Sequence, residues 1–174
     1  MQYISYYKSP LGELLLTGGE TGLDGLWFEG AKYQAQRSEL QGGEKELSVF
    51  VQTKEWLDVY FSGRKPGHMP PLHMKGTAFQ MEVWNILLKI PYGKTVSYGE
   101  IAQEIAKHRR VARMSAQAVG GAVGRNKIAV IVPCHRVIGT DGSLTGYASG
   151  LDRKRWLLNL EGVSPQALGT GGGS

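Results

Sequence analysis

The stretch Ile131-Val132-Pro133-Cys134-His135-Arg136-Val137 holds the only cysteine in this chain of 174 residues. It ends an apolar, largely β-branched run, Ile128–Val132, which predicts a buried extended segment. A cysteine beside a histidine is a candidate nucleophile, because a neighbouring proton acceptor favours the reactive thiolate. The alternative is an inert buried thiol, since a lone cysteine commonly acts as a small hydrophobic residue. A single cysteine also excludes an internal disulfide and a cysteine-rich zinc site.

The residues after this stretch predict a loop and then a helix. Four glycines between positions 139 and 150 predict the loop. Residues 151 to about 160 predict the helix, which the pair Glu161-Gly162 would end. The last residues, 169–174, are rich in glycine and predict a flexible tail or a linker left by cloning.

Upstream, three hydroxyl residues stand where helices are expected to begin. Thr77 and Ser97 are followed three residues later by Gln80 and Glu100, which is the spacing of a capping box. Ser115 can cap a third helix. The second and third helices, joined by a turn, resemble a helix-turn-helix. Because pairs of short helices are common, an ordinary helical protein is the alternative.

The joint between these two helices is basic and carries His108, Arg109, Arg110 and Arg113. Such side chains contact DNA phosphates, and a solvated basic loop is the alternative. The charge distribution of the chain, whose net charge is +5, agrees with the first interpretation. Residues 1–75 hold eight Lys and Arg against nine Asp and Glu, a net charge of −1, whereas the remainder holds twelve against six, a net charge of +6. A basic half favours a polyanionic partner, most often nucleic acid.

The residues before position 76 predict a separate domain that contains a sheet. Strands are expected at Tyr3–Lys8, Glu13–Thr17 and Asp24–Glu29, and the turn signals between them favour an antiparallel meander. The apolar spacing over Glu44–Phe61 predicts an amphipathic helix. Prolines and glycines between 65 and 76 predict a linker.

We therefore expect an α+β fold with a small N-terminal domain of antiparallel sheet plus helix, residues 1–64. A linker, 65–76, leads to a mainly helical, winged-helix-like helix-turn-helix domain, 77–163, and the tail follows at 164–174. The composition, 41% hydrophobic and 20% charged, is typical of a globular protein. No run approaches the roughly 18 apolar residues of a membrane span, and the first nine residues do not form a secretory signal. We expect a cytoplasmic monomer, nucleoid-associated if bacterial, without an obligate protein partner.

The stretch around Cys134 resembles the active-site signature of the O6-alkylguanine-DNA alkyltransferases, also called methylated-DNA–protein-cysteine methyltransferases. The likeness covers about residues 77–162 closely and the residues before them loosely. The other matching motifs are Pro91-Tyr92-Gly93, Ser97-Tyr98-Gly99, Ala118-Val119-Gly120-Gly121-Ala122 with Asn126, Gly146-Tyr147, Leu157-Leu158 with Glu161-Gly162, and, loosely, Ser9-Pro10-Leu11-Gly12 and Gly25-Leu26-Trp27-Phe28.

This resemblance implies DNA repair by direct, irreversible, single-turnover transfer of the alkyl group from O6-alkylguanine in double-stranded DNA to Cys134. The guanine would be flipped out, because a nucleophile cannot reach the alkyl carbon inside the base stack. Glu161 and His135, with a bound water, would deprotonate Cys134. Tyr98 would donate to the departing guanine, and Asn126 would organise the active-site turn. No cofactor is implied.

The resemblance also implies an alkyl pocket walled by the loop 142–150. The residues assigned to this pocket are Val137, Ser143, Tyr147 and Lys154. Without the resemblance, Tyr98, Asn126 and Tyr147 would be interpreted as core or turn residues. DNA would be bound through its minor groove, because the small residues of the third helix allow that helix to approach the groove closely. The residues assigned to DNA contact are Arg113, Ser115, Gln117, Ala118, Gly120, Arg125 and Arg136.

The chain departs from the family pattern in three ways. Gln117 stands where the family usually has an arginine that inserts into the duplex, and our hypothesis is that Arg113 or Arg125 partly substitutes for it. The joint over Lys107–Met114 looks longer than in many relatives. Some relatives hold a structural zinc partly through N-terminal cysteines, and this chain has none there, so we predict no zinc.

Three other interpretations compete with DNA repair. The chain could be a DNA-binding module whose thiol senses alkylation, although it shows no additional regulatory domain. It could be a Cys–His hydrolase, which would explain neither the basic half nor the paired helices. Its glycine-rich end also fits an engineered self-labelling tag derived from the family.

Overall fold

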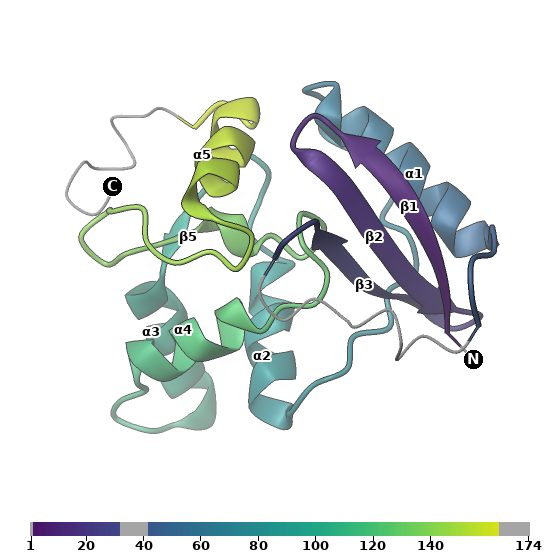
Figure 1. The fold of residues 1–174 in the computed structure, drawn as a ribbon. Helices are drawn as coiled ribbons and strands as arrows, with labels where there is room; N and C mark the ends of the chain where they lie inside the picture. Colours follow the sequence, from purple (N-terminus) through teal and green to yellow (C-terminus); the bar gives the residue numbers. More distant parts are fainter. Residues whose placement is uncertain (1, 32–41, 164–174) are drawn as a thin grey trace. The chain divides into compact units, whose positions relative to one another are not determined.

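The computed structural model describes residues 2–31 and 42–163 (Figure 1). The chain divides into an N-terminal unit, residues 1–75 with 127–131, and a C-terminal unit, residues 76–126 with 132–174. The predicted tail at 164–174 lies outside the described residues. Within the described part of the chain, no helix is long and apolar enough to cross a membrane. The predicted α+β fold is confirmed, because the N-terminal unit holds a sheet with a helix and the C-terminal unit is mainly helical.

The predicted antiparallel meander forms the sheet of the N-terminal unit. Its strands are β1 (Tyr3–Ser9), β2 (Gly12–Gly19) and β3 (Gly22–Phe28), in the order β1-β2-β3. Gly12 and Gly22, which begin the second and third strands, have φ angles of 112° and 144°. Residues that carry a side chain rarely adopt such φ angles, so glycine suits both turns.

One helix, α1 (Ser48–Phe61), packs against this sheet (Figure 1). It begins four residues later than the predicted Glu44. The reason is a backbone pairing with β1, in which Ile4 donates to the Gly43 carbonyl at 2.9 Å and Lys45 donates to the Ile4 carbonyl at 3.1 Å. Because the backbone at 43–45 is bonded to β1 in this way, the helix begins after it, and the tertiary pairing overrides the local pattern.

Two further segments pair with β3 along its backbone. The segment expected to be a linker does so where Leu23 donates to the Pro71 carbonyl at 2.8 Å and accepts from His73 N–H at 2.7 Å. The segment 127–131 does so where Leu26 donates to the Lys127 carbonyl at 2.8 Å. Pairing of this kind satisfies backbone groups that an edge strand would otherwise expose.

The conformation expected for Ile128–Val132 is wrong, although its burial is confirmed. Ile128 makes a β-bridge to Leu26, but residues 129–131 form a turn, and Val130 has a φ angle of 69°. A positive φ is rare for a β-branched residue. Periodicity alone indicated burial here, and it does not distinguish a buried strand from a buried turn.

Three helices of the C-terminal unit begin at the predicted caps. They are α2 (Ala78–Leu87), α3 (Tyr98–Arg109) and α4 (Ala116–Gly124), capped by Thr77, Ser97 and Ser115. Each cap hydroxyl accepts from the backbone N–H three residues later, at 3.0 to 3.1 Å. The predicted helix-turn-helix pair is therefore α3 and α4, which pack together.

The same unit contains small elements that the sequence pattern did not predict. They are the parallel pair β4 (Val96–Ser97) and β5 (Val137–Ile138), and a 3₁₀-helix, η2 (Cys134–Arg136). The predicted last helix is α5 (Leu151–Leu160). β4 directly precedes α3, and β5 directly follows η2, which contains the cysteine. The pairing of β4 with β5 therefore holds the start of α3 beside the cysteine.

Candidate active site

Cys134 begins the 3₁₀-helix η2 and is buried, with 7% of its surface exposed. Its backbone N–H donates to the Val132 carbonyl at 2.8 Å, and the Arg136 N–H donates to the Pro133 carbonyl at 2.9 Å. These two bonds turn the chain tightly around the cysteine. The side chains of residues 134–136 therefore do not alternate as they would on a strand.

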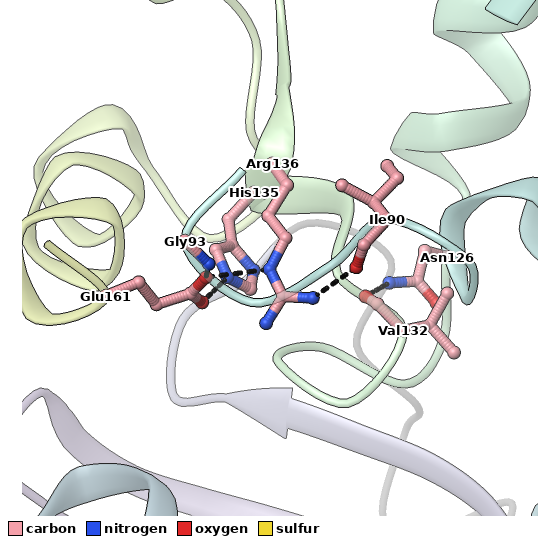
Figure 2. A network of polar contacts seen from close by, with 7 residues as sticks. All are labelled: Ile90, Gly93, Asn126, Val132, His135, Arg136 and Glu161. Carbon is pink, nitrogen blue, oxygen red and sulfur yellow. Dashed lines mark hydrogen bonds and ion pairs between the residues drawn. The ribbon is translucent and has the colours of Figure 1, made fainter. Parts of the chain in front are cut away.

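Asn126 lies after the end of α4 and binds the cysteine directly. Its Nδ2 donates to the Val132 carbonyl at 2.9 Å and to the Cys134 Sγ at 3.1 Å (Figure 2 shows the first bond). A donor aimed at sulfur favours the thiolate over the thiol. Asn126 is thus bonded both to the backbone of the turn and to the cysteine sulfur.

Opposing effects act on the pKa of the Cys134 thiol. Burial raises the pKa of Cys134, while the Asn126 hydrogen bond and the charge of Lys154 act to lower it. The net pKa is raised, so the resting group is the thiol. Formation of the thiolate therefore needs a proton acceptor.

His135 and Glu161 form a buried pair, and His135 Nε2 lies 2.6 Å from Glu161 Oε2 (Figure 2). Burial acts to raise the pKa of Glu161, but the hydrogen bonds of His135 and Arg136, together with the charge of Arg136, lower it to about 2. Burial, together with the charges of Arg136 and Lys154, lowers the pKa of His135 despite the opposite effect of Glu161. At neutral pH the carboxylate is therefore ionised and the imidazole is uncharged.

These charge states fix the tautomer of His135. An ionised carboxylate only accepts hydrogen bonds, so Nε2 of His135 carries the proton that it donates to Glu161. The lone pair of the neutral ring then lies on Nδ1, which is buried. An imidazole with its lone pair on Nδ1 and a carboxylate behind Nε2 has the arrangement of a general base.

Arg136 belongs to the same network, which corrects its assignment to DNA contact. Its Nε donates to Glu161 Oε1 at 2.8 Å and its Nη1 donates to the Ile90 carbonyl at 2.7 Å (Figure 2). The side chain is 10% exposed. A guanidinium that is buried and bound in this way is not presented to a phosphate.

Tyr98, Thr145 and Lys154 form one wall of the site. The Tyr98 hydroxyl donates to the Thr145 carbonyl at 3.3 Å, and Lys154 Nζ donates to the carbonyls of Thr145 and Gly146 at 2.8 and 3.0 Å. Lys154 is fully buried, and burial lowers its pKa to about 8. Burial also raises the pKa of Tyr98 to about 12, so its hydroxyl stays protonated. Both groups interact electrostatically with Cys134.

The other residues assigned to the pocket divide into two kinds. The Tyr147 hydroxyl is buried beside Cys134 and Ser149, and burial raises its pKa well above the usual value. Val137 is paired with Val96 in the β4–β5 ladder. Ser143 has its backbone N–H and its hydroxyl bonded to Asp141 Oδ1, at 3.0 and 2.6 Å. The contacts of Val137 and Ser143 thus shape the surrounding backbone, whereas Tyr147 lies beside the sulfur.

The face of α4 directed away from its neighbours contains mostly small residues. Val119, Ala122 and Val123 are buried, and Trp84 of α2 donates from Nε1 to the Ala122 carbonyl at 2.9 Å. The residues of the opposite face that are exposed are Ser115, Ala116, Gln117, Ala118 and Gly121, while Gly120 is half-buried. A Cβ added at Gly121 would meet no atom of the protein within 4 Å, so internal packing does not require glycine there.

The two arginines proposed to substitute at Gln117 are also exposed. Arg113 lies in the α3–α4 joint, and Arg125 follows α4. Arg109 of the same basic joint is bound to Glu82 of α2 through its Nε at 3.0 Å and lies 5.4 Å from the Phe79 ring. Arg113 and Arg125 are thus exposed around α4, and Arg109 is bound to the neighbouring helix.

Sequence patterns missed three parts of this site: the carbonyls of Ile90 and Thr145, and the N–H of Gly93, which donates to Glu161 Oε1 at 2.9 Å. Backbone groups leave no signal in residue type, so no pattern could have identified them. The burial of Lys154 was equally hidden, because lysine is seldom fully buried. Across residues 2–31 and 42–163, no group of three His, Cys, Asp or Glu side chains is placed to hold a metal ion.

Comparison with known families shows two matching domains. Residues 2–66 match the family described as the ribonuclease-like domain of 6-O-methylguanine DNA methyltransferase, and residues 78–163 match its DNA-binding domain. A methylated-DNA–protein-cysteine methyltransferase of Methanosarcina acetivorans is 44% identical over 160 residues, covering 92% of this chain and 98% of that protein. One of Mycobacterium leprae is 45% identical over 153 residues, covering 88% of each.

Solved structures with the same fold come from Mycobacterium tuberculosis. The crystal structure of its O6-methylguanine methyltransferase is 41% identical, with a TM-score of 0.79 over 95% of this chain and 96% of that one. The structure of M. tuberculosis OGT in complex with DNA is 39% identical, with a TM-score of 0.79 over 95% of this chain and 98% of that one.

Proposed function

This chain belongs to the 6-O-methylguanine DNA methyltransferase family, and from this premise we propose that Cys134 receives the alkyl group. The chain binds DNA and repairs it by transferring an alkyl group from the DNA to a cysteine. Because the sequence holds one cysteine, an internal acceptor can only be Cys134. The observation that supports this proposal most directly is the contact of Cys134 with Asn126 beside the buried His135–Glu161 pair.

The proposed substrate is O6-alkylguanine in double-stranded DNA. The Cys134 thiolate attacks the alkyl carbon, the new S–C bond forms, and the C–O6 bond breaks. The electron pair of the broken bond goes to O6, and protonation of the departing base yields ordinary guanine. The product is a thioether, which water does not cleave under ordinary conditions. Each molecule therefore acts once, and the reaction requires no cofactor.

The proton of Cys134 passes to His135, directly or through a water. The uncharged ring can accept it at Nδ1, and the ionised Glu161 then stabilises the imidazolium through the 2.6 Å contact with Nε2. Asn126 and Lys154 stabilise the thiolate, one by its hydrogen bond and the other by its charge. Hydrogen bonding and a nearby positive charge both favour an anion.

Tyr98 is the proposed donor to the departing guanine. Its high pKa keeps the proton on oxygen, and its present bond to the Thr145 carbonyl is long, at 3.3 Å. A hydroxyl in a weak hydrogen bond can turn to a better acceptor at small cost. Donation to the developing anion on guanine would lower the barrier to C–O6 cleavage.

The exposed face of α4 is the proposed DNA-contact surface. Its small residues allow the helix to approach the groove closely. Glycine within a helix costs about 1 kcal/mol of stability relative to alanine. Internal packing does not require glycine at position 121, so close approach to DNA is a reason for its presence there. Flipping of the base would then bring the alkyl carbon out of the stack. Since its substrate is DNA, we expect the protein in the compartment that contains DNA, which is the cytoplasm if the source is bacterial.

The experiment that tests this function is an intact mass measurement after incubation with a duplex that contains O6-methylguanine. One methyl group should be added per chain, and Cys134→Ala should gain none. A duplex with ordinary guanine is the matched control and should leave the mass unchanged. Repeated turnover, or an unchanged mass of the wild-type chain, would contradict the proposal. Binding without methyl transfer would support the alternative of an alkylation sensor.

A further inference from the structure

The guanidinium of Arg136 connects two segments of the C-terminal unit, the connection between α2 and β4 and the end of α5. Its Nη1 binds the Ile90 carbonyl and its Nε binds Glu161 Oε1 at the end of α5 (Figure 2). The guanidinium also lies 5.7 Å from the ring of Tyr92, which, like Ile90, belongs to the connection between α2 and β4. Arg136 itself is part of η2, next to His135. A single buried cation thus joins the segments that enclose the histidine.

The bonds to Glu161 divide its two oxygens between different partners. Oε1 accepts from Arg136 Nε at 2.8 Å and from Gly93 N–H at 2.9 Å, while Oε2 faces His135 Nε2 at 2.6 Å. With Oε1 held by two donors, the carboxylate cannot rotate without breaking both bonds. The position of Oε2 against the imidazole therefore depends on the Arg136 bond.

We propose that Arg136 is a positioning residue of alkyl transfer, which clamps and neutralises Glu161 so that the neighbouring His135 rests uncharged and aligned to accept the proton of Cys134. The proposal rests on the His135 base of the proposed function and adds a residue to it. Arg136 acts here through Glu161 and His135 and does not contact the alkyl group.

The charges around His135 explain why a cation is needed. Glu161 and Lys154 face it from α5, Arg136 and the Cys134 thiol belong to its own 3₁₀-helix, and Tyr92 lies in the turn beside Glu161 and Arg136. Without Arg136, the negative Glu161 would favour the imidazolium. A histidine that is already protonated cannot accept the thiol proton. The charge of Arg136 lowers the pKa of His135, which agrees with this balance.

The test compares two variants that separate charge from shape. Arg136→Gln keeps a side chain that can donate to Glu161 but removes the charge. Arg136→Lys keeps the charge but loses the planar guanidinium, whose separate N–H groups bind Glu161 and the Ile90 carbonyl at once. The rate of methyl transfer from an O6-methylguanine duplex is measured between about pH 5 and pH 8. We expect the acid limb of the Arg136→Gln profile to move up by about one pH unit, and that of Arg136→Lys to stay near wild type.

A second readout does not depend on alkyl transfer. The ring ¹⁵N shifts of His135, assigned by their loss in His135→Gln, report its protonation in the unreacted protein. The titration midpoint should be higher in Arg136→Gln than in wild type. If the midpoint moves while wild type transfers no methyl group, Arg136 still controls the protonation of His135, and it is the proposed function that fails.

The proposal is overturned if Arg136→Gln lowers the rate by the same factor at every pH and leaves the His135 titration unchanged. That result would mean that Arg136 only supports the fold. If Arg136→Gln does not fold by circular dichroism, Arg136→Lys decides the question alone. An unchanged acid limb and His135 titration then support the proposal, and an upward shift of either overturns it.

Discussion

Asn126 and Cys134 are joined by a hydrogen bond, in which the asparagine Nδ2 lies 3.1 Å from the cysteine Sγ. The same nitrogen also donates to the Val132 carbonyl at 2.9 Å, so one amide both shapes the turn and contacts the reactive atom. Since only Arg125 separates Asn126 from the end of α4, the helix proposed to contact DNA is connected to the thiol through Asn126.

Asn126→Ala should slow methyl transfer at neutral pH by roughly 10- to 100-fold. Removal of the donor raises the pKa of Cys134 further, and a hydrogen bond to a charged group is worth about 1.5 to 3 kcal/mol. The measurement is the single-turnover rate on an O6-methylguanine duplex as a function of pH. Asn126→Asp is the control of matched size and should be slower still, because its carboxylate repels the thiolate. An Asp variant as fast as wild type would show that the amide does not act on the sulfur.

Glu161→Gln should reduce the transfer rate by about 10²- to 10⁴-fold. With Oε1 of the new amide still accepting from Arg136 and Gly93, its NH₂ would face His135 Nε2. That nitrogen must then accept, which moves the ring proton to Nδ1 and removes the lone pair that the base requires. The ring ¹⁵N shifts of His135 should report the change of tautomer. A normal tautomer with a lost rate would contradict this explanation.

The stability of the protein should fall in acid through Glu161. The folded-state pKa of Glu161 is lowered from 4.5 to about 2, so its stabilising contribution is present above about pH 4.5 and is lost as the pH falls toward 2. The contribution at neutral pH is on the order of 3 kcal/mol. Urea unfolding of wild type and Glu161→Gln should show a difference in unfolding free energy that narrows over this range. A difference that stays constant with pH would contradict the assignment.

Gln117→Arg should tighten duplex binding less than tenfold if Arg113 and Arg125 already supply part of the missing positive charge. All three residues are exposed around α4. Arg113→Ala and Arg125→Ala should each weaken binding and reduce the slope of log affinity against log salt by about one. Fluorescence anisotropy over a series of salt concentrations measures both effects, with Gln117→Ala as the neutral control. A large gain in Gln117→Arg would show that nothing compensates.

Arg110→Gly should raise the unfolding free energy by about 1 kcal/mol. Arg110 ends α3 in the left-handed conformation, with φ 57° and ψ 39°, where glycine carries no steric cost. Arg110→Ala removes the same charge but keeps the Cβ, so it should not gain this stability. Thermal or urea unfolding of the three proteins makes the comparison. Equal gains in both variants would attribute the effect to charge and not to the backbone.

Much of the fold could be predicted from local patterns. The three hydroxyl caps and the turns of the meander depend on neighbours within a few residues, and each was confirmed. The errors occurred where distant segments interact. Helix α1 begins late because Glu44 and Lys45 pair with β1, and the run before Val132 is a turn because it pairs with β3 through Ile128 and its neighbours. No local pattern reports such a partner.

The sequence by itself determined the chemistry of this protein: one thiol, the histidine and arginine beside it, a basic C-terminal half and the spacing of its helix caps. Residue type and short-range spacing are enough for these, because reactivity and capping are local properties. Only the tertiary structure decided that Arg136 binds Glu161, that Asn126 contacts the sulfur and that Lys154 is buried against two carbonyls. These contacts join residues of different elements, and burial strengthens them by excluding water. Neither the contacts nor their burial can be predicted from the order of residues along the chain.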